Sequence, residues 1–383
     1  MSFFQNKAVN LLNIHIALIR LASLFSGIFV PVFLLQKGLS IPVICLFSAL
    51  GSLIRIPARI FQVPLVKKIG IKPAVIIGII GVGISYLFLT LAQGIDVYLW
   101  LYVIIGGIFS ALYWQLFHYL FAHYGDNHER GQNVSMQIIF VELIQIIGPL
   151  LGAIIINYQG FFSYTIFIFL ILFLAIIFIL PLSKYPSIKN ICSLSKAFKE
   201  ENKYGMKISI LSSATEASYT YIWIIVIYLT LGELVSFGSA LTLGILISVI
   251  LQAIIGKYID KGKGKSVNFA GLGLSLFTLF GRVLLGYSLF FISIFEGASR
   301  FSRNVNDSVF SVSYYNKAKD SKESFWHILL AETGWDLGSI AGLIGVALLI
   351  FIGVSPRFAM LIGIIPMILL WRVLHNYYRN IEN

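Results

Sequence analysis

The sequence predicts an all-α, polytopic membrane protein: twelve transmembrane helices in two pseudo-symmetric six-helix bundles, with both chain ends in the cytoplasm. Composition is the first observation, since 58% of the 383 residues are hydrophobic, only 11% are charged, and the mean hydropathy is +0.90. Soluble domains contain roughly 45–50% apolar and about 25% charged residues. The second observation is that apolar runs of bilayer-spanning length recur along the chain, whereas β-barrel strands would alternate in polarity. Lipid is therefore the expected solvent.

Twelve apolar runs, each followed by a polar or glycine-rich break, define the expected helices. The break between residues 282 and 285 is the shortest. The predicted ranges are 10–35, 41–65, 72–92, 97–121, 133–156, 161–182, 207–231, 235–256, 266–282, 285–312, 326–351 and 355–374.

Basic residues supply the third observation, because cytoplasmic loops are enriched in Lys and Arg. With the N-terminus inside, 20 of the 28 Lys and Arg residues fall in inner segments. Only Lys37, Arg282 and Arg357 fall in outer segments, and five arginines fall inside predicted helices. This bias predicts a multi-pass protein of the cell membrane, and it explains the net charge of +12 without a nucleic-acid partner.

Two halves follow from the longest polar stretch and from an internal repeat. The Lys-rich stretch 183–206 predicts a cytoplasmic linker between an N-terminal bundle, 1–182, and a C-terminal bundle, 207–383. The fifth and eleventh predicted helices both carry Glu, then Gly six residues later, then Gly four residues after that. The two sets are Glu142, Gly148 and Gly152, and Glu332, Gly338 and Gly342. Repeated halves around a central site are a common transporter plan.

Short loop motifs carry a resemblance to a known family. The loop after the eighth helix reads GKYIDKGKGK and contains Gly256, Asp260, Lys261, Gly264 and Lys265. The matching first-half loop keeps Lys68, Gly70 and Lys72, but has Val63 and Lys67 where Gly and Asp are usual. Arg130 and Gly131 follow the fourth helix, and Gly148, Pro149 and Gly152 form a Gly-Pro step in the fifth.

Together these motifs resemble the major facilitator superfamily over nearly the whole chain. The resemblance implies alternating access, in which two halves rock around a central cavity. The Gly-Pro step is similar to the motif of antiporter and efflux members.

The loop signature predicts a conformational latch. A carboxylate favours the positive end of a helix dipole, so Asp260 is expected at the start of the fifth helix. In the first half, Lys67 and Lys68 are expected to face Asp320 and Glu323 in a charge-swapped version. The alternative is that these lysines only hold their loop in the cytoplasm.

The tenth predicted helix has four charged residues at membrane depth, where ionisable residues are costly and are therefore functional candidates. Glu296, Arg300, Arg303 and Asp307 are spaced four, three and four residues apart, so they share one helix face. This face is expected to line a water-filled cavity or to form a structural network with the eleventh helix. Pairing along the helix, Glu296 with Arg300 and Arg303 with Asp307, is a further possibility. Glu332 and Asp336, four residues apart on that helix, are the expected partners or a shared proton site.

Other candidates lie in separate helices. Glu216, in the seventh, is a proton or cation site or a buried hydrogen-bonded carboxyl, and Glu142 repeats Glu332. Arg20 is expected to neutralise an anionic substrate or to pair with Glu142. Arg55 and Arg59 are expected to snorkel toward the cytoplasm.

Histidines of the fourth helix raise two further possibilities. His118 is a candidate proton relay. His123 and His128, with Asp126, do not form an obviously converging set, so no metal site is predicted.

These observations predict a secondary active transporter of a small molecule, coupled to protons, working in the efflux direction, monomeric and without cofactor. No nucleotide-binding loop or catalytic nucleophile is visible in the sequence, so an enzyme is not expected. Two alternatives remain: a non-transporting sensor or scaffold on the same fold, and a membrane-embedded lipid-modifying enzyme using His118, His123 and Asp126.

Overall fold

A computed structural model describes residues 7–124, 130–182, 203–259 and 264–382 of the chain, and these residues form helices joined by short turns, without a strand. The first half contains α1 to α7. Their bounds are α1 Lys7–Gln36, α2 Ile41–Phe61, α3 Val63–Ile69, α4 Ile71–Leu91, α5 Val97–Tyr124, α6 Arg130–Gln145 and α7 Gly148–Ile179.

Local sequence explains where several of these helices begin and break. Asp96 precedes α5, and its carboxylate accepts the backbone N–H groups of Gln93, at 2.8 Å, and Leu99, at 3.0 Å. These hydrogen bonds, the one from Gln93 first, hold the pKa of Asp96 below its ordinary value. Gly160 has a φ of 79° inside α7, a conformation that favours glycine, and it divides this helix into two arms. The predicted break between 156 and 161 is confirmed.

The second half contains the remaining helices. Their bounds are α9 Tyr204–Thr215, the π-helical turn η2 Glu216–Thr220, α10 Tyr221–Leu231, α11 Leu234–Ile259, α12 Gly264–Leu285, α13 Leu289–Asp320, α14 Ser324–Phe351, α15 Pro356–Ala359, η3 Met360–Gly363 and α16 Ile364–Glu382. The helix α9 begins at Tyr204, inside the predicted linker 183–206, so the second half begins slightly earlier than predicted. Most of that linker, 183–202, lies outside the described residues.

Ten helical segments among the described residues are long and apolar enough to cross a membrane. One of them, Gln137–Ile179, runs over the break at Gly160. The helix α13, which carries the four charged residues of the tenth predicted helix, is not among the ten. The polytopic membrane fold is therefore confirmed, while the count of twelve spans and the cytoplasmic side of the termini stay predictions.

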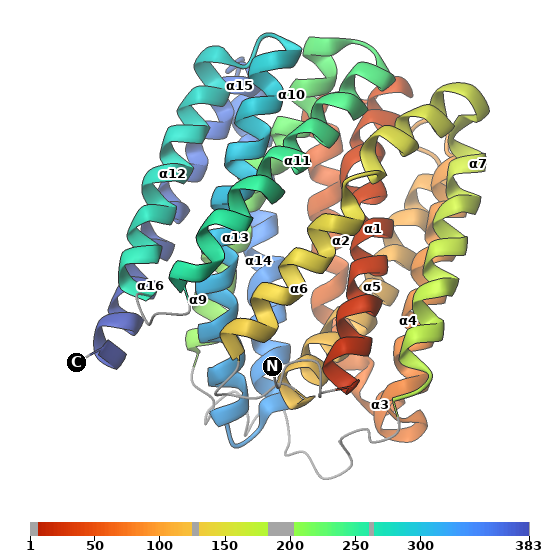
Figure 1. Cartoon of the computed structure of the whole chain (residues 1–383). Helices are drawn as coiled ribbons and strands as arrows, with labels where there is room; N and C mark the ends of the chain where they lie inside the picture. The colour runs from red at the N-terminus through yellow and green to blue at the C-terminus, as the bar shows by residue number, and fades with distance from the viewer. Residues whose placement is uncertain (1–6, 125–129, 183–202, 260–263, 383) are drawn as a thin grey trace.

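The two halves pack against each other along two lines (Figure 1). The helix α2 lies against α14, and α7 lies against α11. Within each half, corresponding helices meet: α1 packs on α6 and α7, and α9 packs on α14. The start of α1 and the end of α16 lie toward the same end of the bundle (Figure 1).

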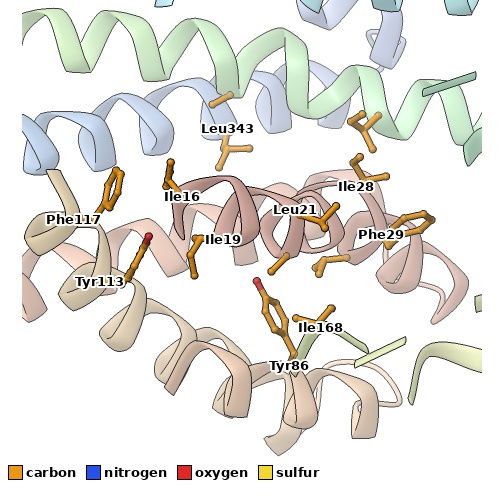
Figure 2. Close-up of a cluster of buried hydrophobic side chains, with 14 of the residues drawn as sticks. Ile16, Ile19, Leu21, Ile28, Phe29, Tyr86, Tyr113, Phe117, Ile168 and Leu343 are labelled. Carbon is orange, nitrogen blue, oxygen red and sulfur yellow. The ribbon is translucent and has the colours of Figure 1, made fainter. Parts of the chain in front are cut away.

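The helix α1 runs through the apolar core of the first half. Its side chains, among them Ile16 and Leu21, lie among residues of α4, α5 and α7, including Tyr86 and Phe117, while Leu343 of α14 approaches from the second half (Figure 2). The core is continuous across the two halves, since it joins α1 to α14 without a polar layer at this point.

Glycines of the internal repeat mark close helix contacts, as small residues do in membrane bundles. A side chain at Gly148 would meet Leu21 and Leu24 of α1. A side chain at Gly338 would meet the backbone of Ile210 in α9. The two glycines therefore serve corresponding contacts in the two halves.

We expect Gly338→Ala to lower the stability of the protein by roughly 1–3 kcal/mol, because the added methyl group meets the backbone of α9 rather than a movable side chain. Thermal unfolding in detergent measures the effect. The matched control is Gly273→Ala in α12, where a Cβ meets nothing within 4 Å. Equal stability of the two variants would contradict the close packing of α14 on α9.

Candidate functional site

Six carboxylates lie within the described helices, away from the helix ends, and six arginines pair with them or lie within electrostatic reach of them. We call these twelve residues the interior charges. The acids are Glu142, Glu216, Glu296, Asp307, Glu332 and Asp336, and the arginines are Arg20, Arg55, Arg59, Arg282, Arg300 and Arg303.

A first cluster of interior charges joins α2 to α14 between the halves. Arg55 Nε lies 2.5 Å from Asp336 Oδ1, and Arg59 Nε lies 3.0 Å from Asp336 Oδ2. Arg59 also approaches Glu332 Oε2 at 3.3 Å. The expectation that Arg55 and Arg59 snorkel to the membrane surface is therefore wrong, because the side chains of Arg59 and Asp336 are almost fully buried in this pair.

His118 of α5 extends this cluster toward α13. Its Nε2 lies 3.5 Å from Glu332 Oε1, and its Nδ1 lies 2.7 Å from the Tyr315 hydroxyl. The imidazole also stacks on Trp114, with 5.7 Å between ring centroids. His118 thus contacts both α13 and α14 from the first half, and its role as a proton relay stays a prediction.

A second cluster centres on the buried carboxylate of Glu296 in α13. Its Oε2 accepts from Arg282 at 2.6 Å and from the indole of Trp223 at 3.1 Å, and its Oε1 lies 3.6 Å from Arg300 Nε. The prediction that Arg282 lies in an outer loop is wrong, because Arg282 is fully buried in α12. The apolar residues on both sides of Arg282 in the sequence are the signal that places it inside a helix.

Arg300 connects the second cluster to the first half. Its Nη1 lies 3.4 Å from Glu142 Oε1 and 3.3 Å from Gln145 Oε1, both on α6. Glu142 is therefore paired with Arg300 rather than with Arg20. One alternative expected the arginines of α13 to pair with Glu332 and Asp336. This pairing is not among the described ion pairs, because Arg55 and Arg59 bind those carboxylates.

The repeated glutamates have corresponding roles in the two halves. Glu142 of α6 contacts Arg300 of α13, and Glu332 of α14 contacts Arg59 of α2. Each glutamate therefore makes a charged contact across the junction between the halves, which gives the sequence repeat a structural meaning.

A cavity of about 560 Å³, partly open to solvent and lined by many polar side chains, lies within the second half between α9 and η2, α12, α13 and α16. Glu216 lies at its edge, on a π-helical turn, a distortion that is frequent at functional sites. The polar lining consists of Ser212, Thr215, Glu216, Tyr219, Thr220, Asn268, Ser275, Arg303, Asn306, Asp307 and Trp371.

Charges in this cavity are loosely paired compared with those of the two clusters. Arg303 Nη1 lies 4.0 Å from Glu216 Oε1, and the Glu216 side chain is 46% exposed. The expected pair of Arg303 with Asp307 along the helix is not among the described ion pairs. Asp307 therefore faces the cavity without a salt bridge among the described residues.

Arg20 stands apart from the other interior arginines. Its guanidinium lies over the Trp114 ring, 4.5 Å from the centroid, and no described ion pair includes it. The side chain is exposed, and the backbone carbonyl of Arg20 accepts a hydrogen bond from Gln145 at 3.1 Å.

The predicted latch residues are only partly described. Asp260 and Lys261 lie outside the described residues, and Gly256, Arg130 and Gly131 are described only as helix backbone. Gly70, with a φ of 86°, ends α3, while Lys67 and Lys68 take part in none of the described ion pairs. The latch stays a prediction.

The Gly-Pro step lies at the second line of contact between the halves. The backbone around Pro149 is close to Gly238 of α11, and Leu150 N donates to the Thr242 hydroxyl at 3.2 Å. Gly148, Pro149 and Gly152 are all buried. This step therefore helps two helices from different halves to approach closely.

Two helical halves joined by charged contacts at membrane depth, with a polar cavity beside them, define a secondary transporter rather than an enzyme. The sequence profile of the Major Facilitator Superfamily matches residues 14–314. The chain belongs to this superfamily. No curated protein sequence matches it.

Solved structures share the fold over nearly the whole chain. The human organic anion transporter MFSD10 (TETRAN) superposes with a TM-score of 0.68 at 15% identity, covering 96% of this chain and 99% of that one. A variant of the E. coli fucose:proton symporter FucP superposes with a TM-score of 0.65 at 15% identity, covering 97% of each chain. FucP in its outward conformation gives 0.61 at 16% identity, again covering 97% of each chain. At these identities the similarity shows the fold alone.

Proposed function

We propose that this protein is a proton-coupled secondary transporter that exports a small molecule across the cell membrane, with the single chain as the transport unit. The supporting observation is the polar cavity, where the carboxylates of Glu216 and Asp307 face Arg303 without a close ion pair. An ionisable group at membrane depth is retained mainly where it serves transport or a proton pathway. The cavity is the proposed proton-coupling site.

Alternating access needs contacts between the halves that can break and re-form. The charged contacts of Glu142 and Glu332 across the junction fit that requirement, since each joins helices of different halves. The buried Gly-Pro step supports export as the direction, through its similarity to the motif of efflux members. FucP is a proton symporter, which supports proton coupling on this fold.

The test uses purified protein in liposomes that contain a pH-sensitive dye. The externally added panel contains lactate, benzoate, choline, fucose and the lipophilic cation ethidium. We expect one class of compound to move together with a pH change. Asp307→Asn should remove the pH change but keep the exchange of labelled for unlabelled compound, which needs no net proton movement.

Glu233→Gln, in the turn before α11 and outside the cavity lining, is the control and should behave as the wild type. Transport by Asp307→Asn with an unchanged proton signal would contradict the proposed coupling site. Absence of transport for every class in the panel would contradict the proposed function. Opposite orientations of the compound gradient determine the direction.

A further inference from the structure

We infer that the transported molecule is a small organic anion with one negative charge, whose carboxylate binds Arg20 between the two halves. This inference rests on the proposed function and specifies its substrate class. Three observations carry it: the lack of an ion pair at Arg20, the position of Arg20, and the charge balance of the interior.

Arg20 is the interior arginine without a carboxylate partner among the described residues. Arg55, Arg59, Arg282, Arg300 and Arg303 each lie within 4.0 Å of a carboxylate oxygen. Arg20 instead lies over Trp114, which fixes its direction but leaves its charge uncompensated. An arginine at membrane depth is costly unless it faces water or an anion.

Arg20 lies near the junction between the halves. Its guanidinium lies over Trp114 of α5, and its backbone carbonyl accepts a hydrogen bond from Gln145 of α6, whose side-chain oxygen accepts one from Arg300 of α13. The Trp114 ring beneath it stacks in turn on His118, which hydrogen-bonds Tyr315 of α13. An anion at Arg20 would therefore sit at the junction that alternating access opens and closes.

Charge balance sets the valence of this anion. The six interior arginines are matched by six interior carboxylates, and among them Arg20 and Asp307 are the two without a salt bridge in the described part of the chain. One bound negative charge leaves the carboxylates in excess by one, and one proton restores neutrality. A divalent phosphate would leave a further uncompensated charge, which is costly in a low-dielectric interior.

Guanidinium chemistry sets the ligand group. The planar fork of arginine binds a carboxylate through two parallel hydrogen bonds, which an ammonium cannot reproduce. Replacement of Arg20 by Lys should therefore weaken binding even though the charge is kept. A sugar, or an amine without a carboxylate, would leave the Arg20 charge uncompensated.

Binding to purified protein in detergent, measured by thermal shift, tests the site without transport. The probes share a phenyl ring and differ in charge: benzoate, benzamide, benzylamine and phenyl phosphate. We expect benzoate to bind, and benzamide and benzylamine not to bind. Arg20→Gln should weaken benzoate binding by roughly tenfold or more, since a charged hydrogen-bond partner is lost.

Arg20→Lys should fall between Arg20→Gln and the wild type. The matched control is Arg357→Gln, because Arg357 also lies over an aromatic ring, Tyr287, at 3.9 Å, but near the start of α15. Benzoate binding that Arg20→Gln leaves unchanged, or preferential binding of benzylamine, would overturn the inference. Tighter binding of phenyl phosphate than of benzoate would also overturn the inference, since the site would then prefer a divalent anion to a monovalent carboxylate.

Flux measurements separate this inference from the proposed function. If one proton moves in the same direction as each monovalent anion, as the charge balance of the interior requires, transport is electroneutral. A potassium diffusion potential set with valinomycin should then not change benzoate flux, whereas a pH gradient should. If choline or fucose moves with protons and carboxylates do not, the proposed function stands and the anion site falls. If benzoate binds through Arg20 but no panel compound crosses, the site stands and the proposed function falls.

Discussion

Glu296→Gln is expected to destabilise the protein more than any other single change to the interior charges. Arg282 is fully buried, and Glu296 is its carboxylate partner among the described residues, at 2.6 Å. Removal of one member of a buried ion pair costs roughly 3–5 kcal/mol, because the other charge is left buried and unpaired. The amide oxygen of Gln can still accept the hydrogen bond from the Trp223 indole, so the expected loss comes from the missing charge.

Thermal unfolding detected with a thiol-reactive dye in a Cys192→Ala background measures this effect, since Cys45 is fully buried in the folded protein and reacts on unfolding. The double variant Glu296→Gln with Arg282→Met should recover much of the stability, because no unpaired charge remains. Glu233→Gln, in the turn before α11, is the control and should have little effect. A wild-type melting temperature for Glu296→Gln would show that the pair is not formed.

Asp336→Asn is expected to loosen the junction between α2 and α14 and to expose it to water. Asp336 forms ion pairs with both Arg55 and Arg59. Its neutralisation leaves Glu332 as the remaining carboxylate partner of Arg59, and it leaves Arg55 without a carboxylate partner among the described residues. We expect the labelling rate of Ser339→Cys by a water-soluble maleimide to rise by roughly tenfold or more, which corresponds to about 1.4 kcal/mol.

Ser339 reports on this junction because its hydroxyl accepts a hydrogen bond from Ser52 of α2 at 3.2 Å. The experiment uses a background in which both native cysteines, Cys45 and Cys192, are replaced by Ala. Asp336→Glu keeps the charge and should restore slow labelling. Slow labelling in Asp336→Asn would mean that the junction depends on apolar packing rather than on these ion pairs.

Hydropathy and charge spacing predicted the approximate helix positions and several of the candidate site residues. Continuous apolar runs locate the helices because a bilayer requires about 20 apolar residues for each span. The residues Glu216, Arg300 and Asp307 were identified as candidates because a charge inside such a run is costly, and the structure places all three at the cavity or between the halves.

Pairing between these charges was predicted only in part. Of the two pairs expected along the tenth helix, Glu296 with Arg300 forms, at 3.6 Å, whereas Arg303 contacts Glu216 rather than Asp307. Arg300 also contacts Glu142 of the first half, which was not predicted. Helical periodicity relates residues on one helix and says nothing about which helix faces it. Arg282 was placed in a loop because the apolar signal weakens near the turn before α13.

The sequence by itself determined the membrane class, the approximate helix ranges and the presence of costly charges at membrane depth, because each depends on composition or on spacing along one helix. The superfamily was indicated by the resemblance of short loop motifs. Only the tertiary structure decided that Asp336 is neutralised from α2, that Glu296 is neutralised from α12, and that Arg20 has no carboxylate partner among the described residues. Ion pairs form between residues that are distant in the chain, and their geometry depends on how the helices pack.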